Sequence, residues 1–430
     1  MIMLNTLGIV IAISIVMYLS MKGVSSIITG PLASLIILVS GGFNFTDFSG
    51  TYATGFANTV KGLLLLYFAS IAMSEIMMRA GMIQSIANWI ADTIGADHVV
   101  MVCIIGVGIL SFGGLGNAAY ITMYWVGVVL CSKANVTRNH IAAACMTAAW
   151  GFSNVLPFIP NNANGVLNNV LKTGADAGMI SGLATGVVQF ILMSLYLTWV
   201  HKKLKAEGKT FDSWELITDT SEDKDLPSVF VSLVPLIVVL VLYNFAKLSI
   251  ISSMFICCIV ATILGIKKLK SDWYLAWQKG FTDALQPICK TAAMAAIGAC
   301  IAITPAFKAL LEMADSANMS PYLMTVLFVE IVGACLGTAG GAVNTGVAAL
   351  QPSIDKWVGM GYDIGVIHRM IAIGSMGLSA LPHSGGINST IAIYKTNFHD
   401  TYKYIFVTVA VIPTITAFLV GLPLALLGFK

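Results

Sequence analysis

The stretch Gly151-Phe-Ser-Asn-Val-Leu-Pro157 recurs as Gly377-Leu-Ser-Ala-Leu-Pro382, 226 residues later, and both copies interrupt a long apolar run. Proline removes a backbone donor and its ring clashes with the preceding turn, which costs a continuous helix about 3 kcal/mol or more. Each copy therefore predicts a helix that is broken near its middle. A similarity at a fixed offset also indicates that the chain contains two copies of one plan.

The same plan relates the segments that precede the two breaks. An apolar run that starts at Phe56 leads to the cluster Gly113-Gly114-Leu115-Gly116-Asn117. A run that starts at Phe281, 225 residues later, leads to the cluster Gly337-Thr338-Ala339-Gly340-Gly341. Glycine suits tight turns because it adopts positive φ and lets backbones approach each other. Each cluster therefore predicts the tip of a helical hairpin.

The composition is typical of a protein embedded in a bilayer. Of the 430 residues, 57% are hydrophobic and 10% are charged, against roughly 25% charged residues in soluble proteins. A helix needs about 20 apolar residues to cross the hydrocarbon core. We expect such stretches, four of them paired or interrupted, at about 4–20, 25–41, 57–80, 99–131, 137–170, 177–200, 228–245, 249–266, 277–303, 321–350, 364–395 and 402–427. The prediction is an all-α polytopic membrane protein.

Several partners and cofactors are not expected. The net charge of +3 is too small to favour nucleic acid. The eight cysteines lie mostly in apolar stretches without a matching pair of ligands, so we expect no metal and no cofactor. The first apolar stretch lacks a positive segment and a cleavage site, so it is expected to remain as a span in the lipid bilayer.

Two transmembrane repeats, 1–201 and 228–430, flank an acidic segment at 202–227 that is predicted to be a cytoplasmic linker loop. Each paired segment could be two full spans or a re-entrant hairpin. With hairpins, every half crosses the bilayer five times, so the second repeat is inverted relative to the first. With both termini outside the cytoplasm, this arrangement places most lysines and arginines in cytoplasmic loops, as topology rules require.

Four non-helical places are expected to meet near the middle of the bilayer, namely the tips 111–117 and 337–345 and the breaks 153–164 and 379–389. Split helices expose amides that suit a carboxylate and carbonyls that suit a cation. We expect substrate contacts from Gly114, Asn117, Asn161, Asn162, Thr338, Gly340, Gly341, Asn344, Ser379, His383, Ser384 and Asn388. We expect contacts with the coupling ion from Asn164, Thr345, Ser389, Glu330 and His383.

Each assignment has a structural alternative. The amides and hydroxyls could cap helices or bond neighbouring helices together. His383 could pair with an anion, relay a proton or be a satisfied structural residue. Glu75, Lys290 and Glu330 could carry protons, although Glu75 and Lys290 could also reach an interface by snorkelling.

At Leu381-Pro-His-Ser-Gly-Gly-Ile-Asn388 and Tyr402-Lys-Tyr-Ile-Phe406 the chain resembles the gluconate permease family of the ion transporter superfamily. The tip Gly337–Gly341 is similar to that of the hydroxybutyrate-permease branch. The resemblance implies a proton- or sodium-coupled symporter of sugar acids or short hydroxy acids, which works as a homodimer by an elevator movement in the bacterial inner membrane. It also implies that the site is lined by Ser379, His383, Ser384, Thr338 and Gly340.

Two departures from the family pattern narrow the expected substrate. Ala380 precedes Leu381, without the acidic residue often found just ahead of it, and Gly333 stands where gluconate-type members carry a basic residue. A short monocarboxylate therefore fits better than a polyhydroxy acid held by arginine. The expected function is cation-coupled uptake of a small organic anion. An anion channel is the nearest alternative, and a membrane-embedded enzyme is disfavoured because the sequence shows no set of catalytic residues at one depth.

Overall fold

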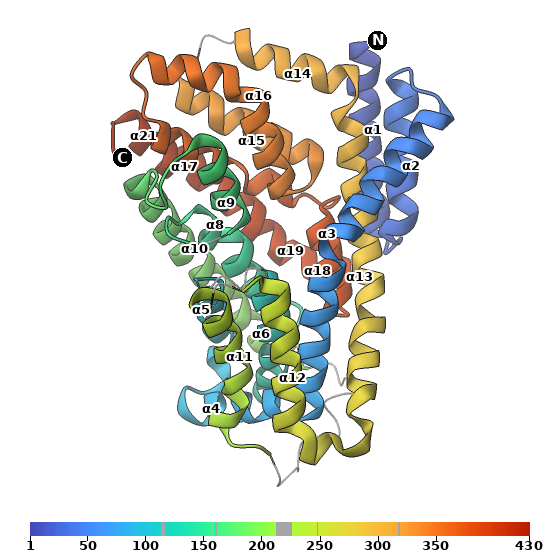
Figure 1. Cartoon of the computed structure of the whole chain (residues 1–430), viewed down its shortest axis with the longest axis vertical. Coiled ribbons are helices and arrows are strands. Elements are labelled where there is room, and N and C mark those ends of the chain that lie inside the picture. The colour runs from blue at the N-terminus through green and yellow to red at the C-terminus, as the bar shows by residue number, and fades with distance from the viewer. Residues whose placement is uncertain (113–116, 160, 212–225, 247, 317–318) are drawn as a thin grey trace. The chain divides into compact units, whose positions relative to one another are not determined.

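The computed structural model describes the chain except residues 113–116, 160, 212–225, 247 and 317–318 (Figure 1). The described residues form helices and connecting turns, without a strand among them. Within this part, five helices are long and apolar enough to cross a membrane, or seven if each of two bent pairs counts as one span. The prediction of an all-helical, multi-pass membrane protein agrees with this architecture.

The helices follow one another closely along the chain. In order they are α1 (Ile2–Met21), α2 (Ser26–Ser40), α3 (Phe45–Arg79), α4 (Met82–Thr93), α5 (Val99–Phe112), α6 (Asn117–Ala134), α7 (Ile141–Met146), α8 (Ser153–Val155), α9 (Asn162–Leu171), α10 (Met179–Ala206), α11 (Val229–Asn244), α12 (Ile250–Leu269), α13 (Trp273–Ala302), α14 (Pro305–Ser316), α15 (Pro321–Leu336), α16 (Ala339–Gly359), α17 (Ile364–Gly374), α18 (Gly385–Ile393), α19 (Phe398–Ile405), α20 (Ile412–Thr416) and α21 (Leu422–Leu426). A π-helical segment, Thr147–Phe152, joins α7 to α8, and the 3-10 turn η4 (Gly377–Ala380) follows α17.

Most expected spans coincide with these helices, and three differ. α3 begins at Phe45 rather than near 57, because its first turns carry polar residues that lower the hydropathy. α10 continues to Ala206, so the segment expected as a loop from 202 starts as helix. The last span contains two π-helical segments, Phe406–Val411 and Ala417–Gly421, each ending two residues before a proline. A proline has no N–H for the helix ladder, and a wider turn accommodates this loss.

By packing, the chain divides into two compact units. Unit 1 comprises 1–62, 150–192 and 287–430, and unit 2 comprises 63–149 and 193–286. The cuts inside α3 and α13 fall after Gly62 and after Gln286, 224 residues apart, which is within one residue of the offset of the predicted repeats. Each unit therefore takes segments from both predicted repeats. Unit 1 contains both breaks and the second paired segment, and unit 2 contains the first paired segment.

The core of unit 1 forms around α15. Val326, Val329 and Val332 of α15 are buried with Ile367 and Ile371 of α17. α15 and α16 lie side by side as the predicted helical pair, and α17 also packs on α15 (Figure 1). The tip and the second break are thus attached to one apolar support.

Candidate functional site

The tip of the second paired segment leaves backbone amides open. α15 ends at Gly337, where φ is +62°, a conformation that favours glycine. Thr338 is extended and makes no side-chain capping hydrogen bond to α16. The first amides of an uncapped helix lack partners and carry the positive end of the helix dipole. The partly exposed residues Ala339, Gly340 and Gly341 therefore present a surface that favours an anion.

The second break presents a similar helix end. The helix that includes α17 and η4 meets α18 at an angle of 61°. Leu381 and Ser384 are extended on either side of the turn, and Ser384 provides no side-chain cap for α18. The first amides of α18 belong to Gly385 and Gly386, where the backbone of Thr291 and the ring of Trp150 leave no space for a side chain. These glycines let neighbouring groups approach the uncapped helix end closely.

His383 lies between these two helix ends. Its side chain is buried, and a Cβ added to Gly337 would lie 3.0 Å from its Nε2 and 2.8 Å from its Cδ2. Neither ring nitrogen has a hydrogen-bond partner within distance and angle limits among the described residues. The backbone groups of Ala334 and Cys335, at the end of α15, lie close enough to interact with the ring. A buried imidazole with unused polar atoms indicates a place for a ligand, since most buried polar groups are paired.

The contact between tip and break can be tested with alanine at two glycines. Gly208 has φ of +66° with nothing within 4 Å of an added Cβ, whereas Gly337 has a similar φ of +62° and also meets His383. Both alanine variants should lose about 1 kcal/mol to backbone strain. We expect Gly337→Ala to lose roughly 1 kcal/mol more because its methyl group displaces the imidazole. Thermal unfolding of both variants measures the difference, and adding His383→Ala should remove the excess. An equal loss at the two glycines would contradict this contact.

Asn388 holds the shape of the second break. Its Nδ2 donates to the carbonyl oxygens of Pro382 at 2.8 Å and Ser384 at 2.9 Å. Its Oδ1 accepts from the Ser26 hydroxyl at 2.8 Å. The oxygen and the nitrogen of this amide therefore both form hydrogen bonds within unit 1. This is the arrangement expected if Asn388 bonds neighbouring segments together. Ser379 and Ser389 are buried nearby in the same segment.

Glu330 attaches the start of the second break to α15. One carboxylate oxygen accepts from the backbone amide of Leu378 at 2.9 Å, and the other accepts from the Thr414 hydroxyl at 3.2 Å. The side chain is only 2% exposed, and no lysine, arginine or histidine pairs with it in the described part of the chain. A buried carboxylate without a counter-charge is costly at membrane depth, which makes it a candidate for proton binding.

The first break is closed by asparagine side chains. Asn161 Oδ1 accepts from the Asn164 amide at 2.8 Å and caps α9, while Asn161 Nδ2 donates to the Ser153 carbonyl oxygen at 3.2 Å. Asn164 Nδ2 donates to the carbonyl oxygens of Leu156 at 3.1 Å and Ile159 at 2.9 Å. Both predicted ligands are thus hydrogen-bonded inside the break.

Two ionisable residues that were not predicted lie against this first break. Arg369 is fully buried, and its guanidinium donates to Ala177 O at 2.8 Å, Val155 O at 3.0 Å and Asn164 Oδ1 at 3.2 Å. His368 contacts the Thr173 hydroxyl at 2.6 Å. Their signal in the sequence is a His-Arg pair inside the apolar run Ile364–Gly374, directly before the second break.

The other predicted residues fall into two groups: some lie at the start of α16, and the structure does not describe the side chains of the rest. Asn344 is exposed on α16, where its Nδ2 donates to the Gly340 carbonyl oxygen at 2.8 Å, and Thr345 follows it. Gly114 lies outside the described residues, and the side chains of Asn117 and Asn162 are not described. Three of the four predicted non-helical places therefore belong to unit 1, and the first tip belongs to unit 2.

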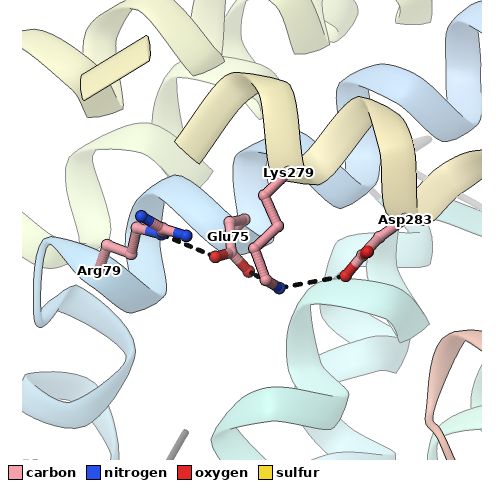
Figure 2. A network of polar contacts seen from close by, with 4 residues as sticks. All are labelled: Glu75, Arg79, Lys279 and Asp283. Atoms are coloured by element: carbon pink, nitrogen blue, oxygen red, sulfur yellow. Dashed lines mark hydrogen bonds and ion pairs between the residues drawn. The ribbon is translucent and has the colours of Figure 1, made fainter. Parts of the chain in front are cut away.

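Unit 2 has its own cluster of charges, in which a buried carboxylate is paired with partly exposed side chains (Figure 2). Glu75 of α3 accepts from Arg79 Nε at 2.7 Å and pairs with Lys279 of α13 at 3.2 Å, and Lys279 also pairs with Asp283 at 3.1 Å. Glu75 is 5% exposed, so it does not snorkel. No group of three or more His, Cys, Asp or Glu side chains that could hold a metal occurs in the ranges that the structure describes.

Comparisons with known proteins point to transport. The model of a family described as GntP family permease matches residues 1–252. A relative from Bacillus subtilis (strain 168), named uncharacterized transporter YxjC, is 23% identical over 459 residues, which cover 96% of this chain and 97% of that protein. The similarity therefore includes both breaks and both paired segments.

Proposed function

The chain belongs to the GntP permease family and is a multi-pass membrane transporter, and we propose that it moves a small organic anion together with a cation by secondary active transport. Its location is then the bacterial inner membrane, with both termini outside the cytoplasm. The single observation that carries the proposal is the meeting of two uncapped helix ends at the buried imidazole of His383.

The chemistry of this site favours a carboxylate. Amides at two helix starts supply donors and partial positive charge without a fixed cation. Gly340 is partly exposed at the start of α16, so a small anionic group could approach its backbone amide without meeting a side chain of its own. No basic side chain stands at Gly333, one turn of α15 before the tip. A short hydroxy or monocarboxylate therefore suits the site better than a large sugar acid.

The coupling cation in this proposal is a proton or a sodium ion. If it is a proton, we propose that Glu330 binds it. Its carboxylate is buried, has no counter-charge in the described structure, and accepts a hydrogen bond from the amide of Leu378 in η4. Protonation would convert one oxygen from acceptor to donor and change its hold on the break. This links the charge of Glu330 to the segment that contains His383.

The proposed mechanism follows the inverted-repeat plan. α5 has 14 residues and α15 has 16, which at about 1.5 Å per residue is shorter than the roughly 30 Å of hydrocarbon. We propose that α5 and α15 belong to re-entrant hairpins in two inverted repeats, which a cytoplasmic loop near 202–227 would join. We further propose that the protein is a homodimer in which the hairpin-bearing part moves as an elevator, as the family resemblance implies.

Purified protein in liposomes tests the transport function. We expect saturable accumulation of labelled lactate or 3-hydroxybutyrate that depends on an imposed proton or sodium gradient. Protein-free liposomes are the control. Flux that does not saturate and cannot exceed equilibrium would indicate a channel and overturn the proposal, and chemical conversion of the label would indicate an enzyme.

A further inference from the structure

The first break has an unusual C-terminal end. When a helix ends, its last four carbonyl groups lose their partners inside the helix. Here side chains supply donors to all four: Asn161 Nδ2 lies 3.2 Å from Ser153 O and 3.5 Å from Asn154 O, Arg369 donates to Val155 O, and Asn164 donates to Leu156 O. The carbonyls that could have coordinated a cation are therefore already occupied.

Arg369 contributes the charge at this place. Its side chain is 0% exposed, and its guanidinium donates to two backbone carbonyls and to the Asn164 amide oxygen. Within the described residues it forms no ion pair with a carboxylate. A buried guanidinium normally pairs with an anion, because desolvation of an unpaired charge is expensive. Here the carbonyl oxygens of Val155 and Ala177 and the amide oxygen of Asn164 solvate the guanidinium in place of an anion.

The two repeats differ at this residue. Arg369 reaches the first break from α17, the helix that leads into the second break. At the repeat offset of 225, the corresponding residue of the first repeat is Ala144. The second break instead faces the buried carboxylate of Glu330, whose counterpart at the same offset is Ile105. The two breaks therefore contact buried groups of opposite charge, and neither charged residue has a counterpart in the first repeat.

We propose that Arg369 is a built-in cation of the first break, which permanently supplies the positive charge that a bound alkali ion would supply at such a helix end. Arg369 is then a positioning residue that closes this break to a coupling ion. It also ties the first break to the helix that precedes the second, because α17 carries both Arg369 and the continuation into η4.

One consequence concerns coupling and rests on the transport function proposed above. If the first break already holds a cation, a coupling sodium ion cannot bind at the oxygens of Val155, Leu156 and Asn164. The coupling site must then lie elsewhere, and among the described side chains of unit 1 Glu330 is the buried anionic group near a break. The closure of the break by Arg369 does not depend on transport and can be tested without it.

Thermal unfolding of purified Arg369→Ala tests the built-in cation directly. Removing the guanidinium leaves buried carbonyls unpaired, at about 1–3 kcal/mol each, so we expect the Tm to fall by roughly 5 °C or more. Guanidinium chloride or sodium chloride at about 10 mM, compared with choline chloride, should recover part of this loss by binding the vacated carbonyls. Wild type should respond to neither salt, and Arg138→Ala, which removes a buried arginine that donates to the Tyr124 hydroxyl at 3.0 Å, should not respond to sodium.

If Arg369→Ala does not fold, two further variants test whether the positive charge at residue 369 stabilises the first break. Arg369→Lys keeps the charge and Arg369→Met keeps a similar length without it, so the lysine variant should be the more stable of the two. Equal stability of these variants, or equal responses of Arg369→Ala, Arg138→Ala and wild type to guanidinium and sodium, would overturn the proposal. None of these readouts requires uptake, so a failure of the transport function would be seen separately in liposomes.

Discussion

Replacing His383 with alanine is expected to weaken binding of the transported anion by about 10- to 100-fold, the equivalent of one lost hydrogen bond to a charged group. The imidazole is buried between the starts of α16 and α18, and neither of its nitrogens has a partner in the described structure. A carboxylate seated on these helix starts would accept a hydrogen bond from the ring. Uptake kinetics in liposomes should show the loss as a raised KM.

The variant His383→Gln separates the possible roles of this residue. Glutamine keeps a neutral donor, so it should retain part of the affinity if the ring only donates a hydrogen bond. If the ring must be charged, glutamine should be as weak as alanine. His399, whose side chain is 63% exposed, provides the control, because His399→Ala should bind the anion normally. Normal uptake by both His383 variants between pH 5 and 8 would show that the residue is structural.

The sequence was sufficient to predict the parts of the fold that depend on backbone chemistry. Proline at 157 and 382 removes donors from a helix, and glycine at 337 allows a positive φ, so the breaks and the second tip could be placed before any packing was known. The apolar stretches gave the spans for the same reason, since length and hydropathy are local properties. The start of α3 at Phe45 was missed because its polar first turns carry no such signal.

The part of the site that depends on tertiary contacts could not be predicted. Arg369 lies about 200 residues away in sequence from the carbonyls that it binds, since its partners are Val155, Asn164 and Ala177. Nothing local distinguishes an arginine that binds a helix end from one that pairs with an acid. Likewise the amide of Asn388 was predicted to contact substrate, and only the structure shows it bonded to Ser26 and to the backbone of the break.

Replacing Glu330 with glutamine is expected to abolish proton-driven accumulation while leaving exchange of anion across the membrane. With one proton per anion, a gradient of one pH unit supports about tenfold accumulation, because 1.4 kcal/mol corresponds to a factor of ten. Glutamine resembles the protonated acid in shape and charge and can still accept from the Leu378 amide, so the break should keep its structure. Without an ionisable group there, the cycle should no longer depend on protons.

Glu75→Gln is the matched control, because Glu75 is also buried but is paired with Arg79 and Lys279. This variant should lose stability through its unpaired cations yet still accumulate anion.

The charged groups around Glu330 do not pair with it. The helices packed on α15 carry His368 and Arg369 on α17, and Asp355 and Lys356 near the far end of α16. The structure shows no ion pair between any of these residues and the Glu330 carboxylate. Labelled anion measured in liposomes with and without a pH gradient, and with unlabelled anion inside, separates accumulation from exchange. If Glu330→Gln still accumulates anion tenfold, its carboxylate is a structural anchor for Leu378 and the coupling group lies elsewhere. If wild type fails in both assays, the error lies in the choice of substrate or in transport itself, and Glu330 is not the cause.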